Sequence, residues 1–144
     1  MNETTDIAHL IQAAIAPVFL LSGVAAMLGV LTNRLARIVD RARTLEDRLE
    51  GQPEALPRLL GDLKVLARRA RYINVAISLC TIAALLVALV VVTLFANAFL
   101  GVQLTREIAL LFVGAMLCLS AAFIAFFVEV RHATASLRIG APHI

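Results

Sequence analysis

The sequence predicts an all-α membrane protein with three transmembrane helices, on the basis of its composition and of where its apolar residues lie. Of the 144 residues, 61% are hydrophobic and 16% are charged, whereas a soluble domain is about half apolar and about a quarter charged. The apolar residues form three blocks, at about 7–31, 73–96 and 108–128. Each block can cross a bilayer core, which requires about 20 residues of helix. We therefore expect residues 1–144 to form a single membrane domain.

The first block is expected to be retained as a span rather than removed as a signal peptide. The six residues before it, Met-Asn-Glu-Thr-Thr-Asp, are acidic, whereas a signal peptide begins with a basic region and has a shorter apolar stretch. The apolar stretch that begins after Tyr72 is longer than one span. Its surplus, Asn97–Thr105, is predicted to form a turn, because Asn97, Gly101 and Gln103 supply residues typical of turns.

Positively charged residues are distributed unevenly between the two sides of these spans. Ten of the thirteen Lys and Arg residues lie in 32–72, and none precedes Ile7. One, Arg106, lies between the second and third spans, and two lie after the third. Because positively charged loops stay in the cytoplasm, we predict an N-terminus outside, a cytoplasmic segment at 32–72 and a C-terminus inside.

The cytoplasmic segment is predicted to be an antiparallel helical hairpin that extends the first and second spans. Apolar residues recur in each arm at alternating spacings of three and four, which is typical of a coiled-coil seam. The seam residues are Leu35, Ile38, Ala42, Leu45 and Leu49 in the first arm, and Leu56, Leu59, Leu63, Leu66, Ala70 and Ile73 in the second. The residues between the arms, 51–57, contain the Gly and Pro that end one helix and begin another. The alternative is a pair of amphipathic helices lying on the lipid headgroups; the unbroken seam favours the hairpin.

Two features indicate a homo-oligomer. Small residues spaced four apart, such as Ser22 with Ala26 and Gly114 with Cys118, allow helices to approach closely in lipid. Contacts within one chain would also explain these pairs. The stronger indication is the seam, because a two-helix hairpin leaves apolar surface on each helix that its partner cannot cover.

One face of the first helix combines polar ends with a small or apolar middle. When the helix is projected at about 100° per residue, this face would suit a pore lined by the first helix of an oligomer. The predicted pore or mouth residues are His9, Gln12, Ala16, Phe19, Gly23, Met27 and Val30, and the basic inner vestibule or lipid contact is formed by Arg34, Arg37 and Arg41. The alternative is that the polar ends reach interfacial water and the arginines anchor the helix to anionic lipid.

We expect no enzyme and no catalytic, cofactor or metal site. The sequence contains no nucleophile elbow, phosphate-binding loop or zinc-binding helix motif. Cys80 and Cys118 lie inside spans without neighbouring ligands, and Glu129, at the end of the third span, is expected at the membrane interface. The basic segment lacks interleaved aromatic residues, so we expect no nucleic acid partner. The expected partners are the lipid bilayer and anionic lipid.

A family resemblance supports the membrane assignment. The stretch from Ile15 to Arg41, above all the run Leu-Thr-Asn-Arg-Leu-Ala-Arg-Ile-Val-Asp-Arg at 31–41, resembles the signature of the family catalogued as Domain of Unknown Function 2721. The resemblance covers most of the chain and implies a multi-pass protein of the bacterial inner membrane. It implies no activity and assigns no functional residue.

Two functional hypotheses follow from the sequence. The first is a homo-oligomeric ion channel or passive conduit lined by the first helix. The second is a non-conducting membrane scaffold or regulator whose basic hairpin binds a cytoplasmic partner or anionic lipid.

Overall fold

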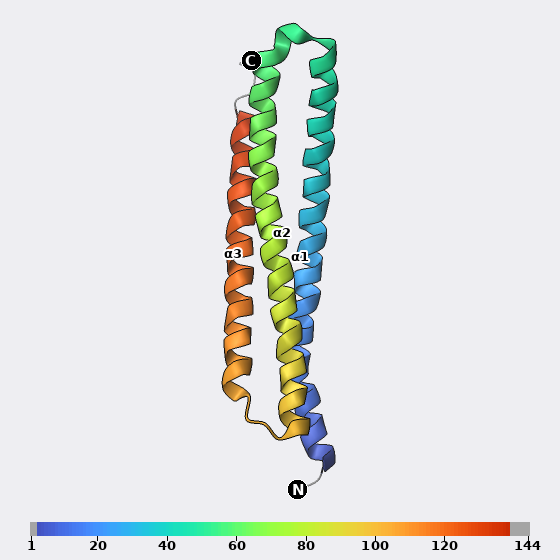
Figure 1. Cartoon of the computed structure of the whole chain (residues 1–144), viewed down its shortest axis with the longest axis vertical. Coiled ribbons are helices and arrows are strands. Elements are labelled where there is room, and N and C mark those ends of the chain that lie inside the picture. Colours follow the sequence, from blue (N-terminus) through green and yellow to red (C-terminus); the bar gives the residue numbers. More distant parts are fainter. Residues whose placement is uncertain (1–2, 139–144) are drawn as a thin grey trace. The chain divides into compact units, whose positions relative to one another are not determined.

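The structure is a computed structural model that describes residues 3–138, with side chains described through residue 135. The described chain consists of α1 (Glu3–Gly51), the short 3-10 helix η1 (Pro53–Ala55), α2 (Leu56–Leu100) and α3 (Thr105–Arg138) (Figure 1). Three of these helices are long and apolar enough to cross a membrane. The predicted all-helical membrane class is confirmed to this extent, and the orientation and the cytoplasmic hairpin stay predictions.

The chain divides into two compact units, and each unit contains part of all three long helices. Unit 1 comprises Met1–Leu28 and Leu79–Ala121, and unit 2 comprises Gly29–Ser78 and Ala122–Ile144. Because the units are drawn from the same helices, the predicted spans and the predicted hairpin do not correspond to separate domains along the sequence.

Unit 1 packs along one side of α2. The buried residues of α2 in this unit recur at spacings of three and four, and they are Cys80, Ala83, Val87 and Val90. Helix α3 lies against α2 at Gly114, where an added Cβ atom would lie in ordinary van der Waals contact, 3.6 Å from Leu86 Cδ1. At this position a small residue of the third span therefore packs within the chain.

The turn between α2 and α3 is shorter than the sequence predicts. Helix α2 continues through Asn97 to Leu100, and only the residues from Gly101 to Leu104 leave the helical conformation. Gly101 has a φ of 65°, a left-handed conformation that ends helices and favours glycine. Asn97 acts from inside the helix, because its side-chain Oδ1 accepts a hydrogen bond of 3.0 Å from the Leu104 N–H.

Unit 2 contains the residues assigned to the predicted hairpin, 32–72, together with part of a third helix that the hairpin prediction did not include. The arms are α1 from Gly29 and α2 up to Ser78, and the break falls at Gln52 and η1, as predicted. Ile38 and Leu66 of the seam are buried, whereas Leu56 at the tip is 47% exposed.

Helix α3 continues past the predicted end of its span, through Arg138, and contacts both arms. Part of the surface that a two-helix hairpin would leave uncovered is therefore covered within the chain. The uncovered hairpin surface was the stronger reason for expecting an oligomer, and that reason is now weaker. The homo-oligomer stays a prediction.

Candidate functional site

Unit 2 contains a fully buried carboxylate, that of Glu129 on α3, whose exposed fraction is 0%. Its Oε1 accepts a hydrogen bond of 3.1 Å from Arg69 Nε on α2, and Arg69 Nη2 lies 3.1 Å from the same oxygen. On the other side, Arg34 Nη2 of α1 lies 2.9 Å from Oε2. One carboxylate thus joins all three helices of the unit.

The two arginines hold Glu129 in different ways. Arg69 donates a directed hydrogen bond, whereas Oε2 accepts no well-aligned hydrogen bond, so Arg34 holds it mainly by charge. The Arg34 Cζ atom also lies 5.3 Å from the centre of the Phe126 ring, within the range of a cation–π interaction. Phe126 and Glu129 lie three residues apart on α3, a spacing that puts both on one helix face. One helical turn further along α3, the ring of His132 stacks on the ring of Tyr72 from α2, with the ring centroids 5.7 Å apart.

The sequence did not predict that the Glu129 side chain is buried against the other two helices. Its expected position at the membrane interface stays a prediction. A carboxylate out of water costs several kcal/mol unless it is paired, and removal of one partner of a buried pair costs about 3–5 kcal/mol. The sequence analysis also did not single out Arg69, which is one of ten basic residues in the segment 32–72. The signal in the sequence was an acid at the end of an apolar span, since such acids are functional candidates by default.

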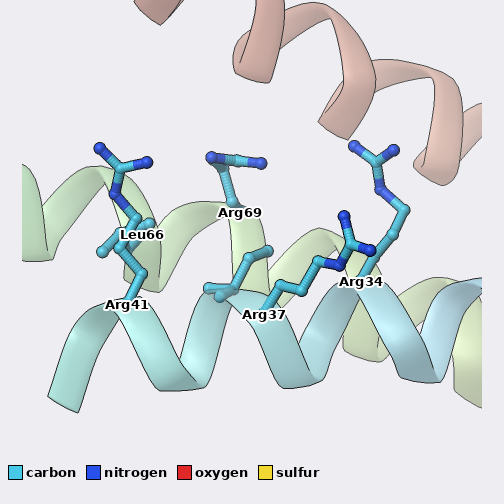
Figure 2. Close-up of a pocket in the computed structure, with 6 residues that line it drawn as sticks. Arg34, Arg37, Arg41, Leu66 and Arg69 are labelled. Atoms are coloured by element: carbon cyan, nitrogen blue, oxygen red, sulfur yellow. The ribbon is translucent and has the colours of Figure 1, made fainter. Parts of the chain in front are cut away.

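A pocket lies beside this cluster, between α1 and α2, with a volume of about 270 Å³. It is lined by four arginines and two apolar residues, namely Arg34, Arg37, Ile38, Arg41, Leu66 and Arg69. Figure 2 shows three of the arginines on α1 and the fourth on α2, with the guanidinium groups of Arg34, Arg41 and Arg69 projecting to the same side. Spacings of three and four place the α1 arginines on one side of that helix. Ile38 and Leu66 are nearly buried and form the apolar base of the pocket.

The pocket has a large surplus of positive charge. Four guanidinium groups and the carboxylate of Glu129 sum to a charge of +3. Arg37 and Arg41 are exposed, and among the side chains described through residue 135 no carboxylate lies within 4.0 Å of either. The predicted group Arg34, Arg37 and Arg41 is therefore brought together in one pocket, but only Arg37 and Arg41 are left without an acidic partner there.

The predicted pore residues do not line this pocket. Six of them belong to unit 1 and Val30 belongs to unit 2. Their side chains are exposed within the chain, with Phe19 at 74%, except that Met27 is half-buried. A role in a pore stays a prediction for all of them.

No group of three His, Cys, Asp or Glu side chains that could hold a metal ion occurs among the residues that the structure describes. The expected absence of a metal or cofactor stays a prediction.

Replacement of Glu129 by Gln should destabilise the protein by about 3 kcal/mol, because two guanidinium groups lose the carboxylate with which they are paired. The measurement is thermal unfolding of the full chain in detergent, followed by far-ultraviolet circular dichroism, and we expect a lower Tm. Glu107→Gln is the matched control, since Glu107 is an exposed acid on the same helix. Equal Tm values for the two variants would contradict a stabilising role for the buried carboxylate.

Comparison with known proteins supports the family resemblance seen in the sequence. A family model described as "Protein of unknown function (DUF2721)" matches residues 14–139, a range that includes the whole basic pocket and Glu129. A search of curated proteins and a search of solved structures each gave no match. With most of its length matched, the chain belongs to the DUF2721 family of proteins of unknown function.

Proposed function

We propose that this protein is a non-conducting membrane scaffold or regulator whose basic pocket binds the phosphate of anionic lipid headgroups at the cytoplasmic face. The observation that carries the proposal is the pocket itself, which is lined by four arginines, of which only Arg34 and Arg69 are paired with the neighbouring carboxylate of Glu129. Such a surplus of positive charge favours an anion as its occupant.

The position of the pocket along the chain supports a lipid as the source of that anion. Arg34, Arg69 and Glu129 each lie within about one helical turn of the end of a predicted span. At that depth, side chains of Arg reach the headgroups, and the cytoplasmic leaflet carries negative charge.

The chemistry of the pocket supports phosphate as the group that is bound. A guanidinium group presents a planar fork of N–H donors that matches two phosphate oxygens, which gives short, charge-assisted hydrogen bonds. Arg34 and Arg69 are held in place by Glu129 before any ligand arrives. Such preorganisation improves affinity because fewer side chains have to be ordered on binding.

We expect phosphatidylglycerol, but not zwitterionic phosphatidylcholine, to bind to the full chain in detergent and to raise its Tm, with native mass spectrometry as a second measurement. The double variant Arg37→Gln/Arg41→Gln should weaken this binding about tenfold, which corresponds to about 1.4 kcal/mol. It leaves Arg34 in place, because loss of Arg34 would also remove a partner of Glu129.

The matched control is Arg43→Gln/Arg48→Gln, which removes the same charge from two exposed arginines of α1 outside the pocket. The control should bind phosphatidylglycerol as the wild type does. An equal loss of phosphatidylglycerol binding in both double variants would show that the lipid is attracted by the basic residues of the helices in general, not by the pocket. Equal binding of phosphatidylglycerol and phosphatidylcholine to the wild type would contradict the proposal as a whole.

A second candidate is the homo-oligomeric conduit lined by α1. What favours it is that the predicted pore residues of α1 are exposed, from His9 through Phe19 to Val30, with the exception of half-buried Met27. A second copy could cover or complete that face. Lipid could equally cover it, and for this reason the conduit ranks second.

The conduit requires ion flux across liposomes that contain purified protein whose oligomeric mass has been measured in the same sample. Phe19→Ser should increase the flux, because a hydrophobic constriction becomes easier to wet. Val18→Ser, next to it on α1 and also exposed, serves as the control. Absence of flux from a verified oligomer would contradict the conduit.

A further inference from the structure

The pocket contains two kinds of arginine, and the difference between them bears on which anion it takes. Arg34 and Arg69 are committed to Glu129, at 2.9 Å and 3.1 Å. Arg37 and Arg41, one helical turn apart on α1, line the same pocket without a carboxylate partner among the described side chains. Two uncommitted positive charges match an anion that carries two negative charges.

Arg34 and Arg69, which are paired with Glu129, have further N–H donors that do not contact the carboxylate. A guanidinium group has five N–H bonds. Arg69 donates that of Nε to Glu129, whereas the Nη2 atoms of Arg69 and Arg34 are paired with the carboxylate by charge. Both side chains remain partly exposed, at 33% for Arg34 and 19% for Arg69. Arg34 and Arg69 can therefore donate hydrogen bonds into the pocket without releasing the carboxylate.

The size of the pocket limits its occupant to a small group. A volume of about 270 Å³ is close to the lower end of ligand sites, which hold about 300–1,000 Å³. The guanidinium groups of Arg34, Arg41 and Arg69 project to one side of the two helices, where a small anion would meet guanidinium groups from both α1 and α2 (Figure 2). This geometry suits a terminal phosphoryl group. The rest of the ligand would extend out of the pocket through its open side.

We infer that the pocket binds a phosphate monoester in preference to a phosphodiester. A phosphate monoester carries a charge of about −1.5 to −2 at pH 7 and three terminal acceptor oxygens. A phosphodiester has one negative charge and two such oxygens, so it would leave one uncommitted guanidinium without a counter-charge. The inference rests on the proposed function and specifies the chemical class of its ligand, which a lipid headgroup or a small soluble molecule could supply.

The test titrates the full chain in detergent with phosphatidic acid, phosphatidylglycerol and phosphatidylcholine, and follows the Tm and native mass spectra. We expect phosphatidic acid to bind at least about tenfold more tightly than phosphatidylglycerol. The variant Arg37→Gln/Arg41→Gln should abolish this difference, and Arg43→Gln/Arg48→Gln should retain it. A parallel titration with glycerol 3-phosphate and with inorganic phosphate identifies the source of the phosphoryl group.

Each outcome separates the inference from the proposed function. Equal binding of phosphatidic acid and phosphatidylglycerol, both lost in the pocket variant, overturns the monoester preference and leaves the proposed function intact. Failure of both lipids to bind better than phosphatidylcholine, together with failure of the soluble phosphates, overturns both. Binding of glycerol 3-phosphate as tight as that of phosphatidic acid supports the monoester class and overturns the lipid as its source.

Discussion

The burial of one carboxylate is the constraint on which the rest of unit 2 depends. Glu129 has no exposed surface, so its charge has to be balanced by groups that contact it directly. Two guanidinium groups do this, one from α1 and one from α2. Because movement of either arginine would remove one of the two charges that balance Glu129, the pairs favour one mutual register of the three helices and one arrangement of the pocket wall that Arg34 and Arg69 form.

The same residue type therefore has two roles within one pocket. Arg34 and Arg69 stabilise the fold and shape the pocket, whereas Arg37 and Arg41 supply its surplus charge. Total charge in the segment 32–72 does not distinguish these roles, since all ten of its basic residues count equally in a sequence. The distinction arises only from which guanidinium group meets the buried acid.

Much of the fold could be predicted from the sequence because it depends on local patterns. The apolar blocks predict the three long helices, and Gly51 with Pro53 marks the break between α1 and α2. The shared face of Arg34, Arg37 and Arg41 follows from their spacing on one helix, and the structure places them in one pocket.

The remaining features depend on contacts between residues that are distant in the sequence. Arg69 and Glu129 are 60 residues apart, and no periodicity within α2 or α3 indicates that these two side chains meet. The second turn was predicted to begin too early, at Asn97 instead of Gly101, because the Asn97 side chain supports that turn from within a helix. Leu56 follows the seam pattern but is exposed, since it is the first residue of α2, beside the turn that joins the two arms.

The most direct test of the charge network is the state of the Arg69 guanidinium group in solution. Full-length protein labelled with ¹⁵N-arginine in micelles allows the Nε–H resonances of individual arginines to be followed by NMR, with assignments from single Arg→Lys variants. We expect the Arg69 Nε–H to exchange slowly with water, as hydrogen-bonded and partly buried groups do, and to exchange fast once Glu129 is replaced by Gln. An Arg69 Nε–H that exchanges as fast as that of exposed Arg43, with or without Glu129, would contradict the network.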